Sequence, residues 1–216
     1  MLRPLLVALT LLGGAAACDL FTPAVQGSGV QAREDRQVAA FESVSLAGSS
    51  DVEIVVGPAQ TVRVEADDNI VPLILTTVAD NTLRISSTGS YNAKNPVKLT
   101  ITVPRLTAIA SSGSGSMTAR DITAGSFAAS LQGSGSVSLA GAADELTADL
   151  QGSGSLSAAA LTTTRATVSL QGSGGAEVHC REQLTASITG SGGVRYTGGA
   201  KDVTRNIVGS GKVSPM

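Results

Sequence analysis

The sequence has few of the residues on which most catalytic and nucleic-acid-binding sites depend. Its 216 residues include no tryptophan, three phenylalanines, two tyrosines and one histidine, His179. One histidine cannot build a multi-histidine metal site, and a serine–histidine–aspartate arrangement would depend on it alone. Fifteen basic and seventeen acidic residues leave a net charge of −2, with no basic cluster among aromatic side chains. We therefore expect no nucleic-acid binding, no metal or other cofactor, and a scaffold rather than an enzyme.

Cysteine is also scarce, because Cys18 and Cys180 are the only two, and this excludes a disulfide framework. Residues 1–17 are typical of an export signal, with one early arginine, an apolar run and three alanines at the end. The run that ends at Cys18 resembles the lipobox of bacterial lipoproteins. This resemblance implies acylation of Cys18 and a membrane anchor in the cell envelope. Because Ala15 stands where leucine is usual, cleavage after Ala17 to release a soluble periplasmic or secreted protein is the alternative.

Residues 18–37 are polar, contain proline and glycine, and include the mixed-charge stretch Arg33 to Arg36. Such a composition favours a flexible segment over a packed one. We therefore interpret residues 18–37 as a flexible tether between the anchor and a folded domain.

The most informative feature is a Gly-Ser-Gly motif that recurs about every 19 residues. Its glycine pairs are Gly113 and Gly115, Gly133 and Gly135, Gly152 and Gly154, Gly172 and Gly174, Gly190 and Gly192, and Gly209 and Gly211. A fixed period near twenty is typical of a solenoid whose stacked coils each hold one repeat. A flexible glycine–serine linker is the alternative, since composition alone would allow it.

Apolar residues alternate on both sides of each motif, which a linker has no reason to do. Phe127, Ala129 and Leu131 precede Gly133, and Val137 follows it with the same parity. Each coil should therefore have two strands facing one core, joined by the glycine turn and by a return loop such as 140–145 or 197–202. Both glycines of a motif share the inward parity, where the backbone can turn sharply or approach its neighbour closely. The sequence predicts an all-β fold, a right-handed parallel β-helix or β-solenoid over residues 105–216.

Residues 38–104 keep strand character without the full repeat. Val44 to Ile54 reproduce the phase of a coil, with Ser50 in place of the second glycine. Short alternating segments follow, separated by turn residues such as Gly57-Pro58. We interpret this part as an irregular N-terminal β region that holds a degenerate coil and caps the end of the solenoid.

These motifs together resemble the GIN-domain family of auto-transporter adhesin heads over residues 38–213. The resemblance depends on four ordered motifs: Phe41-x-x-Val44-x-Leu46-x-Gly48-x-x-Asp51-Val52-x-Ile54-x-x-Gly57, Val62-x-Val64, Leu83-x-Ile85, and Val103-Pro104-x-Leu106 before the first Gly-Ser-Gly. It implies a β-helix similar in shape to pectin lyases but without their catalytic groups. It also implies a role in cell-surface adhesion.

No catalytic constellation stands out along the repeats. The acidic residues lie near loops at unrelated phases, which is typical of a solvated rim. His179 has outward parity, and Cys180 has the inward parity of a small buried residue. Gln132, Gln151 and Gln171 share one outward position in consecutive coils, so we expect stacked amides that hydrogen-bond along a ladder.

The sequence thus predicts an exported, lipid-anchored, non-enzymatic protein of the cell envelope, with an adhesin-like binding or structural role. Its partners would be an unidentified surface glycan or protein, and the membrane through the lipid anchor. Because the coil after Gly209 leaves a strand edge uncovered, we also expect a homo-oligomer. Two alternatives stay open: a β-helix enzyme acting on envelope polysaccharide, and a periplasmic partner-binding module in signalling or assembly.

Overall fold

The computed structural model describes residues 23–216, so the predicted export signal and Cys18 lie outside the described residues. The fold is nearly all β, with 71% of residues in strands, which confirms the predicted class. Among residues 23–216 the only helical segment is the 3-10 turn η1, Val71–Leu73. The strands are β1 (Val25–Gln26), β2 (Gln31–Asp35), β3 (Ser43–Gly48), β4 (Asp51–Val56), β5 (Thr61–Asp67), β6 (Ile74–Ala79), β7 (Thr82–Ser87), β8 (Tyr91–Asn92), β9 (Lys98–Val103), β10 (Ala108–Gly113), β11 (Ser116–Gly133), β12 (Ser136–Gly152), β13 (Ser155–Gly172), β14 (Gly175–Gly190), β15 (Gly193–Thr197), β16 (Asp202–Gly209) and β17 (Lys212–Pro215).

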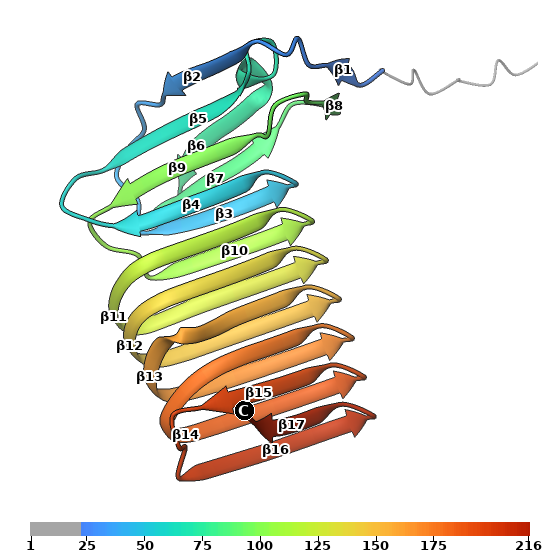
Figure 1. Ribbon diagram of the computed structural model, residues 1–216. Helices are drawn as coiled ribbons and strands as arrows, with labels where there is room; N and C mark the ends of the chain where they lie inside the picture. The colour runs from blue at the N-terminus through green and yellow to red at the C-terminus, as the bar shows by residue number, and fades with distance from the viewer. Residues whose placement is uncertain (1–22) are drawn as a thin grey trace, which may run out of the picture.

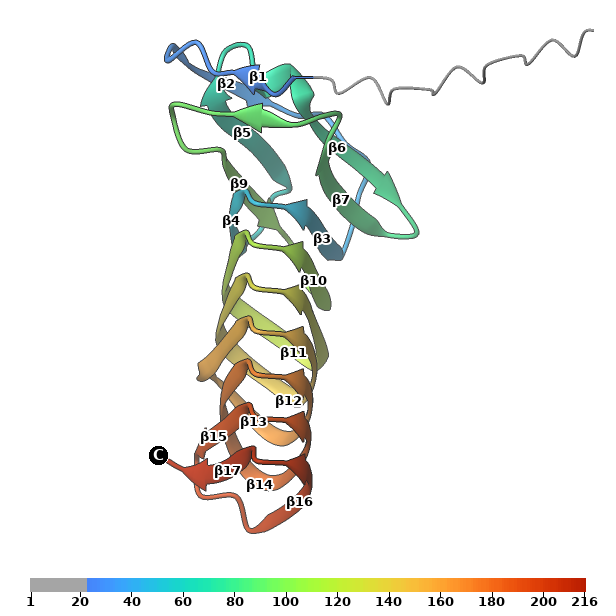
Figure 2. The ribbon, with the colours of Figure 1, turned by 90° about the vertical axis from the view of Figure 1, so that its right-hand side faces the viewer.

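The Gly-Ser-Gly repeats form a β-solenoid of about five turns from residue 108 onward, as predicted. Each of the long strands β11 to β14 leaves one glycine turn, crosses one face of the solenoid, bends, and returns along the other face (Figures 1 and 2). Successive coils pair in parallel, so the fold has two faces of stacked strands around a narrow core. Residues 140–145 are wrongly predicted as a loop, because they lie inside β12 and pair with β13. The loop expected near 197–202 is present between β15 and β16.

The core consists of columns in which one inward residue from each coil stacks on the next. Phe127, Leu146, Ala166 and Leu184 form one column and are at most 2% exposed. Burying a large aliphatic or aromatic side chain stabilises a fold by roughly 1.5–3 kcal/mol. The alternating apolar residues in the sequence are the inward residues of these columns. The core could therefore be predicted although it contains few aromatic residues.

The two glycines of each motif occupy different environments. The second glycine, such as Gly154, is buried in every motif but the last, whereas the first, such as Gly152, is exposed or half-buried. Inward parity is therefore wrong for the first glycine. Gly152 has a φ of 115°, and a Cβ atom there would lie 2.5 Å from the carbonyl oxygen of Gly133 in the preceding coil. That same oxygen accepts hydrogen bonds from the backbone of Ser153 and Gly154 at 2.9 and 3.0 Å, so the turns hold the coils together.

The N-terminal region continues both faces of the solenoid and covers its end (Figures 1 and 2). Strands β3 and β4 form the first coil, in which Gly48 pairs with Gly113 and Val52 with Met117. On one face β7 lies beside β3 and is followed by antiparallel β6. On the other face β9 lies beside β4 and is followed by antiparallel β5 and β2.

The tether predicted for residues 18–37 is wrong from Gln31 to Asp35, because these residues form strand β2. This strand pairs antiparallel with β5, and the pairing is reinforced by ion pairs from Arg33 to Glu65 and from Asp35 to Arg63. The strand is short and almost wholly exposed, so it has no apolar alternation to detect. A polar composition in this segment therefore accompanies a paired strand and not a flexible tether.

A buried carboxylate connects three parts of this region. Asp67 is fully buried, and it accepts hydrogen bonds from the backbone of Gly29 at 3.1 Å and of Lys94 at 2.7 Å, and from Asn95 Nδ2 at 2.6 Å. Burial by itself raises the pKa of this carboxyl, but the hydrogen bonds from Lys94, Asn95 and Gly29 outweigh it and lower the pKa below its ordinary value. The stability of this region therefore depends on whether Asp67 is ionised.

We predict that acid weakens this region through Asp67. A carboxyl whose pKa is lowered on folding contributes stability above its unfolded pKa of about 3.9, and this contribution is lost as pH falls through the folded pKa. Melting temperatures measured by circular dichroism should fall below about pH 4. Asp67→Asn should melt lower at pH 7 and show a shallower loss on acidification. An unchanged pH profile in Asp67→Asn would contradict this assignment.

At the opposite end, β16 pairs with β14 and β17 pairs with β15, and no further described strand pairs with either one. Ile207 and Val208 of β16 are 40% and 70% exposed. Arg205 occupies an inward position opposite Ala186 and contacts the Tyr196 hydroxyl at 3.2 Å. The expected homo-oligomer stays a prediction.

Candidate binding face

The residues that the sequence singled out do not come together in one site. The first glycines of the motifs pair from coil to coil and form a column of turns along the solenoid, and Cys18 lies outside the described residues. His179 is partly buried and contacts the Thr197 hydroxyl through Nδ1 at 3.3 Å, while Cys180 is fully buried. Neither residue faces a described cavity.

The three glutamines stack in neighbouring coils as expected, but they do not form the expected hydrogen-bonded ladder. Gln132, Gln151 and Gln171 do pair in register, and Thr189 follows them. Their amides form no hydrogen bond with one another. They therefore supply an exposed polar stripe rather than a bonded ladder.

The acidic residues of the repeats are dispersed, and two of them pair with arginines on the next coil. Glu145 contacts Arg165, and Glu177 contacts Arg195. Within residues 23–216 no three histidine, cysteine, aspartate or glutamate side chains gather as metal ligands. Glu145 and Glu177 therefore form ion pairs that link neighbouring strands.

One face of the molecule carries an unbroken row of polar side chains from the cap to the last coil. The row begins on β2 and continues through β5, β9, β4 and the first halves of β11 to β14 to β15 and β17. Its members pair directly from strand to strand: Asp35, Arg63, Thr100, Glu53, Thr118, Ser138, Ser157, Glu177, Arg195 and Ser214. All of them point away from the core, because their chain neighbours on each strand point inward. We call this surface the polar face.

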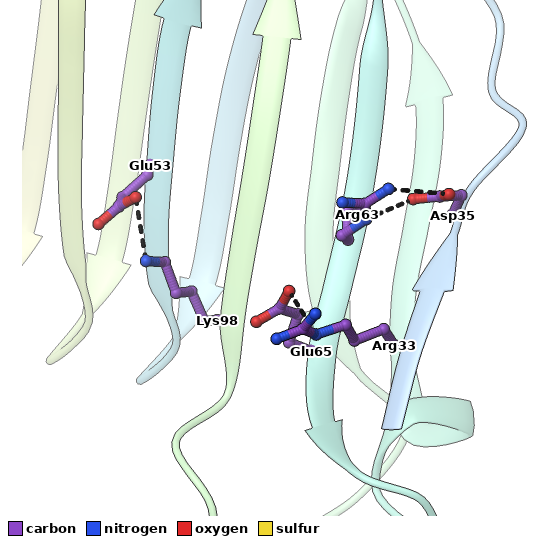
Figure 3. A network of polar contacts seen from close by, with 6 residues as sticks. All are labelled: Arg33, Asp35, Glu53, Arg63, Glu65 and Lys98. Carbon is purple, nitrogen blue, oxygen red and sulfur yellow. Dashed lines mark hydrogen bonds and ion pairs between the residues drawn. The ribbon is translucent and has the colours of Figure 1, made fainter. Parts of the chain in front are cut away.

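A second row lies beside the first on the polar face. Its members are Arg33, Glu65, Lys98, Asp51, Ser116, Ser136, Ser155, Gly175, Gly193 and Lys212. In the cap, ion pairs link neighbouring strands within each row, and the pair of Lys98 with Glu53 joins the two rows. Figure 3 shows Arg33 with Glu65, Arg63 with Asp35, and Lys98 with Glu53. The cap end of the polar face is thus charged but balanced, whereas the middle is made of hydroxyl groups.

The cap end of the polar face is hollowed into a groove of about 430 Å³. Its floor is the outward side of β5 and β9, with Thr61, Arg63, Thr100 and Thr102. Its wall is the chain that leaves β2, where Arg36 still bonds to the Val62 carbonyl at 2.8 Å and the next residues diverge from β5. The groove therefore forms where two paired strands separate. Its volume lies in the range of small-molecule binding sites.

Several hydrogen-bonding groups in this groove have no partner in the protein. The hydroxyls of Thr61, Thr100 and Thr102 and the amide of Gln37 make no side-chain hydrogen bond with residues 23–216. Arg63 instead donates two bonds to Asp35, from Nε at 2.7 Å and from Nη2 at 3.1 Å.

The acidic and basic groups of the groove balance. The hydrogen bond from Arg63 is the main cause that lowers the pKa of Asp35, so this carboxyl is ionised at neutral pH. Asp35 and Glu65 are matched by Arg36 and Arg63, so the lining has no net charge. The groove offers a polar surface suited to an uncharged ligand.

Comparison with known proteins decides the family. The family model described as "Putative auto-transporter adhesin, head GIN domain" matches residues 40–200. The chain belongs to this family. The GIN-domain assignment confirms the resemblance seen in the sequence, and no curated protein matches the chain.

Solved structures agree on the fold of this GIN domain. A putative adhesin from Bacteroides fragilis has a TM-score of 0.73 at 23% identity, over 89% of this chain and all of its own. A putative lipid binding protein and a putative adhesin from Parabacteroides distasonis have TM-scores of 0.59 and 0.57, at 20% and 22% identity; each covers 90% of this chain and is covered completely. At these identities the likeness establishes the shared fold.

Residues 23–216 contain no helix long and apolar enough to span a bilayer.

The groove could not be located from the sequence, although one signal was present. Thr100 and Thr102 alternate with buried residues in the segment 97–103, which marks them as outward. Nothing in the sequence shows that β5 and β9 become neighbours, or that Arg63 lies opposite Asp35. Those pairings depend on the antiparallel cap, which does not follow the repeat.

Proposed function

We propose that this GIN-domain protein is an exported, non-enzymatic, adhesin-like binding module of the cell envelope, anchored by lipid at Cys18. In this proposal the groove at the cap end of the polar face holds an uncharged saccharide. The observation that carries the proposal is the set of unpartnered hydroxyl and amide groups in the groove, beside a balanced ion pair. Family membership supports the adhesin-like role.

The chemistry of the groove suits a saccharide better than a charged or apolar ligand. A sugar hydroxyl both donates and accepts a hydrogen bond, as do the hydroxyls of Thr61, Thr100 and Thr102. Neighbouring sugar hydroxyls can also bond to Asp35 and to the guanidinium of Arg63, and bonds to charged groups are the stronger ones. An anion or a cation would gain little from a lining without net charge.

The carboxylates of the groove do not favour hydrolysis. A glycosidase needs one carboxyl group with a raised pKa to protonate the leaving group. Asp35 has a lowered pKa because Arg63 stabilises its ionised form, and Glu65 is paired with Arg33 at 3.0 Å. These contacts support binding without turnover and weigh against the alternative of a β-helix enzyme.

The test uses binding of neutral disaccharides by isothermal titration calorimetry. Cellobiose, maltose, lactose and N,N′-diacetylchitobiose serve as probes, and we expect at least one of them to bind. Thr100→Val with Thr102→Val keeps shape and strand propensity but removes two hydroxyls, so its affinity should be about tenfold weaker.

The matched control is Thr118→Val, because it removes the same group from the same polar face outside the groove. This variant should bind as tightly as the unmodified protein. If none of the disaccharides binds, or if the groove variant loses no affinity, the saccharide proposal is wrong. If bound sugar is cleaved, the non-enzymatic assignment is wrong.

A further inference from the structure

A second hollow lies on the polar face, at the end opposite the cap. It has a volume of about 410 Å³, and its lining includes Ser155, Ser157, Gly175, Glu177, Gly193 and Arg195. The lining comes from three successive strands, β13, β14 and β15. The ion pair of Glu177 with Arg195 forms one side, and the two serine hydroxyls have no hydrogen-bond partner among residues 23–216.

The hollow exists because two side chains are missing from the second row. Ser116, Ser136 and Ser155 occupy this outward position in three consecutive coils, and Gly175 and Gly193 follow them. Neither glycine has a positive φ. A Cβ atom at either one would meet nothing closer than 3.7 Å.

The fold therefore does not require these two glycines, unlike the glycines of the turns. Glycine weakens a strand and often marks a place where a ligand approaches the backbone closely. Glycine occupies the same register position in two successive coils. Gly175 and Gly193 therefore leave the backbone uncovered between Ser155 and Lys212, and this backbone forms the floor of the hollow.

This hollow and the groove share the same polar face and the same chemistry. Each contains a carboxylate–guanidinium pair on the first row, Asp35 with Arg63 and Glu177 with Arg195, beside hydroxyl groups without partners. Each lining includes both acidic and basic groups and no aromatic ring. The strands between them are β4, β11 and β12, so four spacings of about 4.8 Å separate the nearest lining strands, β9 and β13, by roughly 19 Å.

Polar side chains also cover the distance between the two sites. Glu53, Thr118 and Ser138 continue the first row, and Asp51, Ser116 and Ser136 continue the second. No large apolar side chain interrupts either row. A hydrophilic chain lying along the solenoid axis would meet hydrogen-bonding groups throughout.

We infer that the hollow at Gly175 and Gly193 is a second saccharide subsite, and that one neutral polysaccharide chain occupies both sites along the polar face. This inference depends on the proposed saccharide binding in the groove. A pyranose ring rests on the bare backbone, and its hydroxyls bond to Glu177, Arg195 and the two serines. Binding one chain at two sites makes the second contact intramolecular, which raises affinity without any new contact at the first site.

The experiment compares short and long probes of one chemistry. Di- and hexasaccharides of the cello-, malto- and chito- series are titrated into the protein. A disaccharide is too short to reach from the groove to the hollow, whereas a hexasaccharide can. We expect the hexasaccharide of the binding series to bind about 100-fold more tightly than its disaccharide.

The variant Gly175→Thr with Gly193→Thr fills the hollow. It should fold at least as stably as the unmodified protein, because threonine favours strands and the positions have room. We expect it to keep the disaccharide affinity and lose the gain with length. The matched control is Ser169→Thr with Ser187→Thr, which places threonine on the same two coils of the opposite face, and it should keep the gain.

The outcomes separate this inference from the proposed function. If disaccharides bind and the hexasaccharide binds no more tightly, the groove stands alone and the second subsite is wrong. The same conclusion follows if the threonine variant keeps the full gain. If no probe of either length binds, both the groove proposal and the two-site inference fail.

Discussion

Leu150→Asp is expected to unfold the solenoid at room temperature. Leu150 is 3% exposed and stacks between Leu131 and Leu170 in a column of inward residues. The substitution removes a buried aliphatic group and places a carboxylate without a partner in the core, which costs about 5 kcal/mol or more. Because domains are stable by roughly 5–15 kcal/mol, this loss is comparable with the whole free energy of unfolding. Circular dichroism during heating and urea titration would measure it.

Ser153→Asp is the matched control, since it introduces the same side chain three residues away. Ser153 is exposed at the glycine turn, and its contact with the preceding coil is made by its backbone nitrogen rather than by its side chain. The melting temperature should change by only a few degrees, as for most surface substitutions. Equal melting temperatures for the two variants would show that the assigned inward phase is wrong.

The repeat part of the fold could be predicted because its physics is local and periodic. Phe127, Leu146 and Ala166 recur at one phase, and the parallel stacking that makes them neighbours follows from the same period. A solenoid repeats one contact pattern, so a single correct phase places every coil. The prediction of a loop at residues 140–145 is wrong because the sequence varies there while the backbone still pairs with the next coil.

The cap could not be predicted in this way. Strand β2 pairs with β5 and β5 with β9, so neighbours in space come from positions about 30 to 40 residues apart with no repeated signal. Arg33 and Asp35 look like solvated charges in the sequence, yet in the fold they lie opposite Glu65 and Arg63. The groove depends on those pairings, so its residues became visible only with the structure.

The glycines show how one residue type can have two physical roles. In the turns, Gly152 has a φ that side chains avoid and lies against the carbonyl of Gly133. On the polar face, Gly193 has neither constraint. The sequence alone does not distinguish these two positions. The backbone geometry does, because it shows which glycine the fold needs and which one only leaves space on the surface. The difference can be measured with a single substitution at each position.

Gly152→Ala is expected to destabilise the protein by about 2–4 kcal/mol. The alanine Cβ would lie 2.5 Å from the Gly133 oxygen, and relieving that clash moves the carbonyl that binds the backbone of Ser153 and Gly154. A φ of 115° adds strain for any residue with a side chain. Chemical denaturation should show a lower midpoint, and amide hydrogen exchange should speed up first at the turns of the neighbouring coils.

Gly193→Ala is the control for that experiment, because it makes the same chemical change on a strand with room for it. Its nearest neighbour would be the Lys212 oxygen at 3.7 Å, an ordinary contact distance. Replacing a strand glycine by alanine restricts the unfolded chain, so the midpoint should stay the same or rise by the equivalent of up to about 1 kcal/mol. Similar losses in both variants would mean that glycine is needed on the polar face for folding. The hollow would then lose the argument that the fold leaves it open without a structural reason.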